Sequence, residues 1–296
     1  MVMNKNYLLV SSVYNEERYI ENTIKSVVNQ TLRPVEWIVV SDASTDRTDE
    51  IVKHYSSQYP FITFLRFENK EVIRSKFGRV AKRKTAAINA GLKVKKRNDH
   101  EFIGNLDGDV TFKEDYYEKL IDKFASNSRL GLAGGFIYNI EGDRKWGNFT
   151  NPQGVGGAIQ FFRRQCWEEI GGYYPGGHED YFAGIGCRMC NWKTQAFPDL
   201  EVLHHKHPEA LNISMLHVTF YLGQMDYICG EMFLYACARA IQILPEKPII
   251  ILSILRIMGY LSLAIKREPV QLPPQYKKFM RKLQIDKLKS IIFRRG

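Results

Sequence analysis

Short apolar runs alternate with amphipathic segments through the first 110 residues of the chain. Four runs have the length and β-branched content of buried strands: residues 7–13, 35–40, 61–67 and 102–106. After the first run, apolar residues recur at helical spacing and predict a helix with one buried face. These residues are Ile20, Ile24, Val27 and Val28. The alternation is typical of a parallel sheet with crossover helices, so we expect an α/β fold.

Polar residues and glycines indicate where these segments begin and end. Asn15 follows the first run and precedes two acids, so we expect it to cap the first helix. A later helix with a basic start is expected to end at Gly91. The glycine-rich stretch 171–177 is typical of a loop, and it brings Glu179 and Asp180 to the start of another helix.

The last third of the chain changes character. Residues 231–244 and 249–265 are strongly apolar, and Arg256 interrupts the second segment. The second segment has 17 residues, at the short limit for crossing a bilayer. Together with two serines and Gly259, Arg256 makes a narrow polar strip. Such a strip fits a helix that lies in a membrane interface or packs on a neighbour better than a transmembrane span.

Net charge separates the two ends of the chain further. The 296 residues carry +10, and residues 266–296 hold ten Lys or Arg and two acids, or +8. The first 265 residues therefore carry only +2. A near-neutral body with a basic tail argues against a nucleic-acid-binding core. It favours one local anionic partner, which we predict to be an anionic membrane surface.

Cysteine usage and the N-terminus bear on location. The five cysteines are scattered and odd in number, which favours reduced thiols. No charged leader with a long apolar stretch is evident, so we expect no signal peptide. We predict a cytoplasmic protein, peripherally associated with the inner face of the cell membrane. The alternative is that the two apolar segments form a homodimer interface or cover the core, with a solvated tail.

Two carboxylates one residue apart, Asp107 and Asp109, follow the apolar run 102–106. If that run is a buried strand, the pair emerges at its carboxyl end, where open α/β sheets place their ligands. Two hard oxygen donors this close suit a divalent cation that also holds a diphosphate. The alternative is an acidic turn without a metal.

Four short motifs occur in one order along the chain. They are Tyr14-Asn15-Glu16-Glu17, Ser41-Asp42-Ala43-Ser44, Asp107-Gly108-Asp109 and Glu179-Asp180. The series resembles the inverting family 2 glycosyltransferases with the GT-A fold, a Rossmann-like nucleotide-binding sheet with helices on both faces. Residues 157–164 and 171–173 also resemble a subgroup from bacterial surface-polysaccharide pathways. The likeness covers residues 7–207, but at 41–44 one acid and a glycine of the family pattern are missing.

The resemblance implies a nucleotide-sugar donor, with Mg²⁺ or Mn²⁺ as cofactor. Asp109 would be the direct metal ligand, and Asp107 would contact the ribose or the metal shell. Asp42 would accept a hydrogen bond from the donor's base, and the Val13 backbone and Glu16 would line the same pocket. Basic residues would approach the diphosphate or form a solvated basic face. These basic residues are Arg79, Arg83 and Lys84.

The resemblance also implies catalytic roles later in the chain. Asp180 would be the base that removes the proton of the acceptor hydroxyl as that oxygen attacks the anomeric carbon. Glu179 would orient Asp180 or hydrogen-bond the acceptor, and the alternative is that the pair only caps a helix. His204 or His205 would be a further metal ligand, or part of a polar loop near the acceptor or the diphosphate.

We therefore predict a metal-dependent, non-processive glycosyltransferase that moves one sugar to a lipid-linked oligosaccharide or another glycan acceptor. The lack of Gln-x-x-Arg-Trp after Asp180 argues against a processive synthase. Residues 1–112 would bind the donor and 113–212 the acceptor, and 213–296 would form a helical, basic, membrane-associating extension. Two alternatives are a sugar nucleotidyltransferase, which would need an N-terminal glycine-rich loop, and a catalytically silent membrane-bound scaffold of the same fold.

Overall fold

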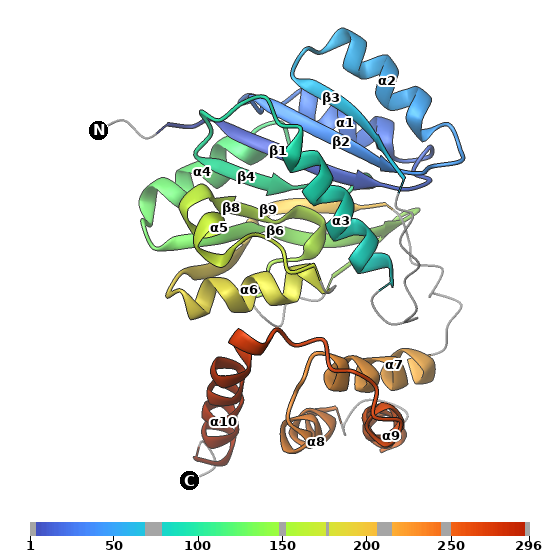
Figure 1. Cartoon of the computed structure of the whole chain (residues 1–296), viewed down its shortest axis with the longest axis vertical. Coiled ribbons are helices and arrows are strands. Elements are labelled where there is room, and N and C mark those ends of the chain that lie inside the picture. Colours follow the sequence, from blue (N-terminus) through green and yellow to red (C-terminus); the bar gives the residue numbers. More distant parts are fainter. Residues whose placement is uncertain are drawn as a thin grey trace. The chain divides into compact units, whose positions relative to one another are not determined.

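A computed structural model describes residues 4–68, 79–147, 152–175, 178–205, 215–243 and 250–293 (Figure 1). The chain divides into two compact units, which we call the sheet unit (Met1–His207) and the helical unit (Pro208–Gly296). The predicted division of the first unit at residue 112 into donor and acceptor halves stays a prediction.

One mixed sheet organises the sheet unit. Within the described residues, its strands follow the order β3-β2-β1-β4-β8-β6-β9-β5, with β7 paired to β6. The strands are β1 (Tyr7–Val13), β2 (Glu36–Asp42), β3 (Ile62–Phe67), β4 (Phe102–Asn105), β5 (Val110–Phe112), β6 (Leu130–Glu141), β7 (Arg144–Trp146), β8 (Phe161–Arg163) and β9 (Lys193–His204). The first four pair in parallel, whereas β8 runs antiparallel to both β4 and β6.

Helices cover both faces of this sheet (Figure 1). They are α1 (Ile20–Val28), α2 (Thr48–Gln58), α3 (Arg79–Lys93), α4 (Tyr116–Ser126), α5 (Arg164–Ile170) and α6 (Glu179–Met189). Alternate side chains of β1 enter opposite cores: Tyr7 and Leu9 pack with residues of α1 and α4, while Leu8 and Val10 pack with residues of α3, α5 and α6. Because both faces are buried, the parallel strands are continuous apolar runs.

The parallel strands deliver the predicted motifs to one edge of the sheet. Val13, the last residue of β1, pairs with Ser41 near the end of β2. β4 ends at Asn105, which pairs with Val10 of β1, and the chain continues through the Asp-x-Asp segment 107–109 into β5. β5 in turn pairs with the end of β9, which brings His204 to the same edge.

Two local predictions were wrong. Asn15 does not cap α1, which begins at Ile20; it has a φ of 53°, and its Oδ1 accepts a hydrogen bond from the backbone N–H of Thr45 at 2.9 Å. Asparagine tolerates this left-handed conformation, so Asn15 joins the loops after β1 and β2. Gly91 does not end α3. A Cβ there would lie 2.7 Å from Cγ2 of Val40, so glycine lets the helix pack closely on the sheet.

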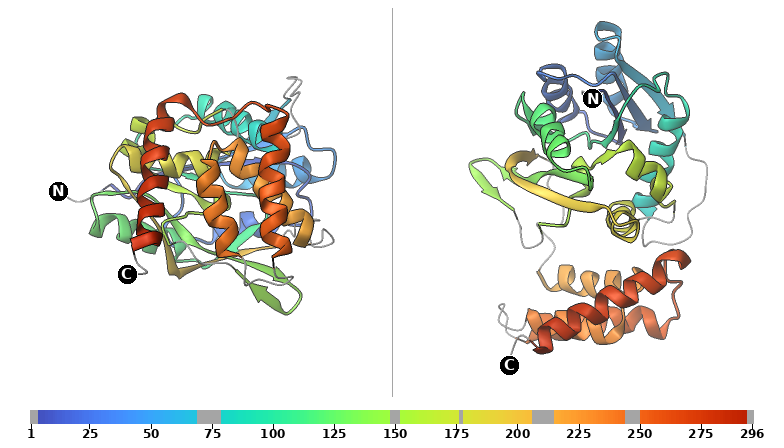
Figure 2. Two further views of the ribbon diagram at one scale, coloured as in Figure 1. Left: turned by 90° about the horizontal axis from the view of Figure 1, so that it is seen from below. Right: turned by 90° about the vertical axis from the view of Figure 1, so that its left-hand side faces the viewer.

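The helical unit is described as α7 (Met215–Ile228), α8 (Phe233–Gln242), α9 (Ile251–Ile265), the 3-10 helix η3 (Pro274–Tyr276) and α10 (Lys277–Phe293). Figure 2 shows α8 between α9 and α10. α7 and α9 approach closely at two glycines. A Cβ at Gly223 would lie 1.9 Å from the carbonyl oxygen of Arg256, and one at Gly259 would lie 2.0 Å from that of Phe220. Neither position has room for a larger residue.

Charged side chains lie at the centre of the helical unit. Arg256 of α9 donates from Nε and Nη2 to the carboxylate of Asp226 on α7, at 2.7 and 3.0 Å. Arg239 of α8 donates to both Asp226 and Glu231, at 3.0 and 2.8 Å. Asp226, Glu231 and Arg256 are each at most 5% exposed. These charges are therefore compensated mainly by one another and not by water.

The polar strip of α9 faces this centre, and apolar side chains face outward. Ser253 is buried and donates to the carbonyl oxygen of Ala240 at 2.7 Å. Ile254, Met258 and Ile265 are 51%, 52% and 79% exposed. The polar strip therefore packs α9 against its neighbouring helices. Among the described helices, none is long and apolar enough to cross a membrane.

Candidate active site

A pocket of about 260 Å³ lies where β1, β2 and β4 end. Its walls come from the ends of these strands, the segments that follow them, and α3. The lining residues are Ser12, Tyr14, Glu16, Asp42, Arg83, Lys84, Asp107, Gly108 and Asp109. Most residues predicted to bind the donor therefore lie together, although they come from four separate stretches of the chain.

Asp109 and His204 form a largely buried pair in this site. Oδ2 of Asp109 lies 3.2 Å from Nε2 of His204, and its buried Oδ1 has no hydrogen-bond partner among the residues described. Nδ1 of His204 lies 3.0 Å from Oδ1 of Asn139 on β6, which fixes the orientation of the ring. The hydrogen bond to Asp109 raises the pKa of His204 above its ordinary value.

His205 faces elsewhere, because successive side chains of an extended segment point to opposite sides. Its Nε2 lies 2.7 Å from Oγ1 of Thr111, and burial lowers the pKa of His205. Only its backbone N–H reaches the Asp-x-Asp segment, donating to the carbonyl oxygen of Asp109 at 2.9 Å. Of the two histidines singled out as ligands, the geometry offers the ring of His204.

Lys84 of α3 joins the Asp-x-Asp segment to the start of α6. Its Nζ lies 2.6 Å from Oδ1 of Asp107 and 3.7 Å from Oε1 of Glu179. It also donates to the carbonyl oxygen of Gly157 at 3.4 Å. Burial alone would lower the pKa of Lys84, but the carboxylates of Asp107, Glu179 and Asp180 hold it above its ordinary value. In this structure the ammonium is the counter-ion of the cleft's acids.

Asp180 lies directly beside this set. A Cβ at Gly157 would lie 2.8 Å from Oδ2 of Asp180, so the carboxylate packs on the bare backbone of the glycine. The carbonyl oxygen of the same Gly157 accepts hydrogen bonds from Lys84 and, at 2.6 Å, from Nδ2 of Asn105. Both acids of the Glu-Asp motif and the first acid of Asp-x-Asp thus gather around one lysine.

Burial affects these acids strongly. It raises the pKa of Asp107 above its ordinary value, although the ammonium of Lys84 opposes the effect. Burial likewise raises the pKa of Glu179, and the charge of Asp180 adds to that shift. Several groups shifted by burial and charge within one cleft are typical of an active site.

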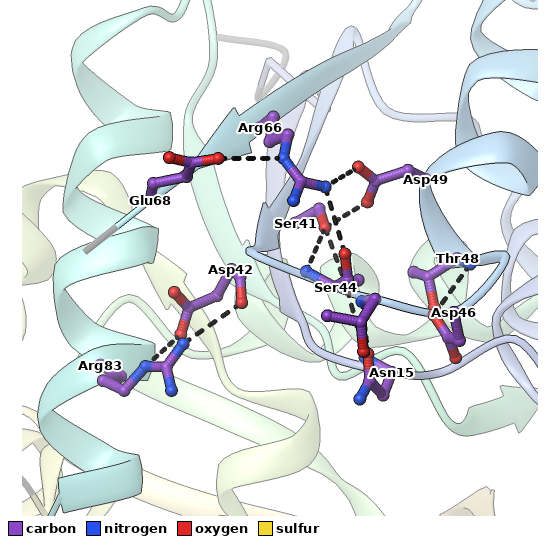
Figure 3. A network of polar contacts seen from close by, with 11 residues as sticks. Asn15, Ser41, Asp42, Ser44, Asp46, Thr48, Asp49, Arg66, Glu68 and Arg83 are labelled. Atoms are coloured by element: carbon purple, nitrogen blue, oxygen red, sulfur yellow. Dashed lines mark hydrogen bonds and ion pairs between the residues drawn. The ribbon is translucent and has the colours of Figure 1, made fainter. Parts of the chain in front are cut away.

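Asp42 and Arg83 form an ion pair that lines the pocket (Figure 3). Nε of Arg83 lies 2.9 Å from Oδ2 of Asp42, and its Nη2 donates to the carbonyl oxygen of Asp42 at 3.3 Å. In the part of the chain described, the buried Oδ1 of Asp42 has no hydrogen-bond partner. The guanidinium also lies 5.3 Å from the ring centre of Tyr14, which is 48% exposed. An aromatic ring near a free carboxylate oxygen suits a planar base with an N–H group.

A polar network holds the loop after β2 (Figure 3). Oγ of Ser41 contacts Asp49 of α2 and lies 3.0 Å from Oγ of Ser44. Arg66 of β3 pairs with the same Asp49 and donates to the carbonyl oxygen of Ser44 at 3.2 Å. Ala43 stands where the resembled family has a glycine, and its φ of 56° lies in the region that favours glycine. The network holds the loop in place despite that substitution.

The remaining predicted donor contacts are close to the pocket or outside the described chain. Glu16 is buried and lines the pocket, and its N–H donates to Oγ1 of Thr48 at 2.7 Å. A Cβ at Gly108 would lie 2.8 Å from Cγ1 of Val13, so glycine lets the Asp-x-Asp segment pass close to β1. α3 begins at Arg79, whose side chain lies outside the described residues.

Three contacts of the site had no role assigned from the sequence. Tyr14 could have been recognised from the sequence, since an aromatic residue directly after a buried strand lies at the ligand-binding edge of the sheet. Gly157 could also have been recognised, because paired glycines before an apolar run indicate close backbone contact. Asn139 could not have been found in this way, since only the pairing of β6 with β9 brings it to His204.

Asp109 and His204 suit a divalent cation that is shared with a substrate. Carboxylate oxygen and imidazole nitrogen both bind Mn²⁺, and the free Oδ1 of Asp109 is a buried donor atom without another use. The described residues contain no group of three or more Asp, Glu, His or Cys arranged around one metal position. One or two protein ligands suffice where substrate phosphates supply the others.

Residues 9–183 match the model of the family described as Glycosyl transferase family 2. The chain is 30% identical over 123 residues to glycosyltransferase GlyA of Streptococcus pneumoniae. It is 27% identical over 150 residues to the minor teichoic acid biosynthesis protein GgaA of Bacillus subtilis. These matches cover 42% and 49% of this chain but only 16% and 30% of the two relatives, so they span less than a third of either protein.

Solved structures extend the similarity to almost the whole chain. The mannosyltransferase PcManGT of Pyrobaculum calidifontis, in complex with GDP-Man and Mn²⁺, matches with a TM-score of 0.56 at 17% identity, covering 98% of this chain and 88% of that one. S. aureus TarS 1–349 in complex with UDP-GlcNAc matches with a TM-score of 0.52 at 16% identity, covering 88% and 73%. These matches confirm the predicted GT-A fold. Because the family model covers more than half of its residues, the chain belongs to glycosyl transferase family 2.

Proposed function

We propose that this protein is an inverting, non-processive glycosyltransferase that moves one sugar from a nucleotide-sugar donor to a lipid-linked oligosaccharide or another glycan. The observation that carries the proposal is the gathering of Asp107, Glu179 and Asp180 around Lys84. Direct transfer needs a donor-side group and an acceptor-side base within one cleft, so that both substrates are held for reaction. The donors named for the neighbouring structures, GDP-Man and UDP-GlcNAc, support a nucleotide-sugar here.

The donor's base lies beside Tyr14 and donates an N–H to the free Oδ1 of Asp42. Uracil, thymine and guanine all carry such a group. Arg83 is about one-third exposed, so its guanidinium is able to turn from Asp42 toward the diphosphate. Asp107 then contacts the ribose or the metal shell from the other side of the pocket.

Asp109 and His204 would hold Mn²⁺ or Mg²⁺ together with the diphosphate of the donor. When bound, the cation supplies Lewis-acid stabilisation of the leaving diphosphate. Asn139 keeps the imidazole of His204 turned toward the site, as partners of metal-binding histidines commonly do. Mn²⁺ in the PcManGT complex supports this assignment.

Asp180 takes the proton of the acceptor hydroxyl while that oxygen attacks the anomeric carbon. The new C–O bond forms opposite the bond to the leaving diphosphate, so the configuration of the sugar inverts. Lys84 compensates the negative charge that three acids bring into the cleft. Glu179, buried next to Asp180, positions it or hydrogen-bonds the acceptor.

A lipid-linked acceptor requires a site of action at a membrane. The outward apolar residues of α9 suit insertion into an interface, as amphipathic helices do. Basic residues near an anionic leaflet contribute about 1 kcal/mol each, and residues 266–296 carry +8. We therefore propose peripheral association with the cytoplasmic face of the cell membrane.

The first test separates catalysis from donor binding. We expect Asp180→Asn to lower transfer of labelled sugar from UDP-GlcNAc or GDP-Man to extracted membrane glycans and lipids about 10²- to 10⁴-fold. Thermal shifts with UDP or GDP and Mn²⁺ should stay as in the wild type. Asp115→Asn is the matched control, because Asp115 is an exposed carboxylate at the N-terminus of α4.

Near-normal transfer by Asp180→Asn would exclude it as the base. An equal loss in both variants would point to helix capping, which any carboxylate at a helix N-terminus provides. Asp109→Asn should instead remove the Mn²⁺-dependent part of the nucleotide thermal shift. If no nucleotide stabilises the wild-type protein with or without Mn²⁺, the silent scaffold becomes the better explanation.

A further inference from the structure

The helical unit contains a pocket of about 430 Å³ that is formed entirely by its own residues. Two tyrosines, Tyr227 of α7 and Tyr260 of α9, form part of its wall. Val270 and Leu272 of the segment before η3 add apolar surface, and the positive charges come from α10. The pocket therefore combines an apolar and aromatic wall with a cationic one.

The cations are Lys277 and Arg281, which lie one helical turn apart and so share a face of α10. Neither forms an ion pair with any residue of the described chain. Nη1 of Arg281 is buried, and within the described residues it has no hydrogen-bond acceptor. A buried guanidinium N–H without an acceptor is costly, and an oxygen-bearing anion bound in the pocket would satisfy it.

Glu231 also lines this pocket, and one oxygen of its carboxylate is paired with a cation of the unit's charged centre. Its Oε1 accepts a hydrogen bond from Nη1 of Arg239 at 2.8 Å, and its carbonyl oxygen accepts one from the hydroxyl of Tyr260 at 2.9 Å. The acid therefore compensates Arg239 in the centre of the unit. The charges of Lys277 and Arg281 remain available to a ligand.

Apolar side chains beside the pocket are accessible to solvent. Val270, which lines it, is 47% exposed. Phe233 packs on Tyr260 with ring centres 5.4 Å apart and is 46% exposed. A ligand bound to the cations would continue over these side chains if it carried an apolar chain. Both features suit an amphiphile with an anionic head.

We propose that this pocket binds the phosphate group of a lipid. Arg281 and Lys277 donate to the phosphate oxygens, as guanidinium and ammonium groups commonly do, and Val270 and Phe233 contact the first methylenes of the chain. The choice of a lipid over a free phosphate rests on the proposed membrane-bound function. The site is separate from the donor pocket, since every residue that lines it belongs to the helical unit.

The test uses the full chain, without nucleotide or metal, and calorimetric titration with hexyl phosphate and inorganic phosphate. High salt is used so that unspecific surface attraction is screened. Hexyl phosphate should bind at least about tenfold more tightly than inorganic phosphate, since each buried methylene adds about fourfold. Arg281→Gln should weaken hexyl phosphate binding about tenfold or more, and Lys277→Gln somewhat less.

Lys282→Gln is the matched control, because Lys282 is an exposed cation of the same helix that does not line the pocket. An equal loss in this variant would reduce the effect to general surface charge and overturn the proposal. Equal affinity for the two phosphates would overturn the lipid assignment. Unchanged binding in a folded Arg281→Gln protein would overturn the site. A failed nucleotide thermal shift would count against the glycosyltransferase and leave this titration unaffected.

Discussion

The two units of this chain differ in where their charged and exposed apolar side chains lie. In the sheet unit, apolar residues of β1 fill cores on both faces of the sheet, and charged residues gather in the cleft at the strand ends. In the helical unit, Asp226, Arg239 and Arg256 meet at the centre. Several apolar residues of α8 and α9 are exposed, among them Leu234 at 67% and Ile265 at 79%, whereas others, such as Leu252 and Leu263, are buried.

This difference indicates that the units are adapted to different surroundings. The sheet unit follows the rule for water-exposed proteins, in which burial of apolar area drives folding. Exposed apolar surface on this scale commonly marks a contact site for a membrane or another protein. Buried ion pairs add little net stability but fix which groups meet, so the charged centre specifies how α7, α8 and α9 pack. The comparison supports the proposed contact of the helical unit with a lipid interface.

The largest expected effect is on the charged centre. Asp226→Leu leaves Arg239 and Arg256 without a common counter-ion, so we expect the helical unit to lose about 3 to 5 kcal/mol. Hydrogen exchange read by mass spectrometry should show α7 and α9 losing protection while β1 and β4 keep theirs. Asp199→Leu is the matched control, since it breaks only the partly exposed pair with Lys123, worth about 1 kcal/mol or less.

A second variant keeps this prediction interpretable. Asp226→Leu combined with Arg256→Met replaces the main ion pair by apolar groups, and it should recover part of the lost protection. Equal loss of protection in both units after Asp226→Leu would contradict the view that the charged centre stabilises the helical unit alone.

The contrast between units also explains what the sequence could reveal. The parallel strands were found because burial on both faces makes them continuous apolar runs, and the motifs were placed because those strands share one edge. β9 was not predicted, since its twelve residues include a proline and alternate irregularly between buried and exposed positions. α7 was missed because its apolar residues are spread around the helix and do not gather on one face.

The candidate site was predictable in its acids but not in its contacts. The motifs identified Asp107, Glu179 and Asp180, yet only tertiary packing brings Lys84 and Gly157 between them. A local signal can also have two physical causes. Gly91 was interpreted as the end of a helix, whereas in the structure it allows α3 to pack closely on the sheet. In the helical unit the pattern of α9 revealed the polar strip, while its partner Asp226 had no local signal.

A smaller expected effect is a different pH dependence of stability in the two units. His100 precedes β4 and is 2% exposed; burial lowers its pKa to about 4, and the charges of Lys95 and Arg164 add to this. The unfolded chain therefore binds the proton first. The stability that neutral His100 contributes is lost as pH falls from about 6.5 to about 4, by at most about 3 kcal/mol.

In the helical unit the pH dependence of stability has the opposite sign. Burial raises the pKa of Glu231, so the stability that its neutral form contributes is lost as pH rises. Hydrogen exchange at a series of pH values should show protection of β4 falling toward low pH earlier than protection of α7. His100→Leu should flatten the dependence in β4 and leave α7 unchanged. If protection of β4 in the variant depends on pH as it does in the wild type, His100 does not cause that dependence.

The smallest expected effect concerns the outer face of α9. Ile254→Ser combined with Met258→Ser removes two half-exposed apolar side chains, so we expect binding to vesicles with anionic lipid to weaken roughly tenfold, or about 1.4 kcal/mol. Sedimentation with the vesicles measures the bound fraction. Val94→Ser is the matched control, because Val94 is 42% exposed in the sheet unit. Unchanged vesicle binding, together with conversion of a dimer to a monomer, would show that this face contacts a second copy of the chain and not lipid.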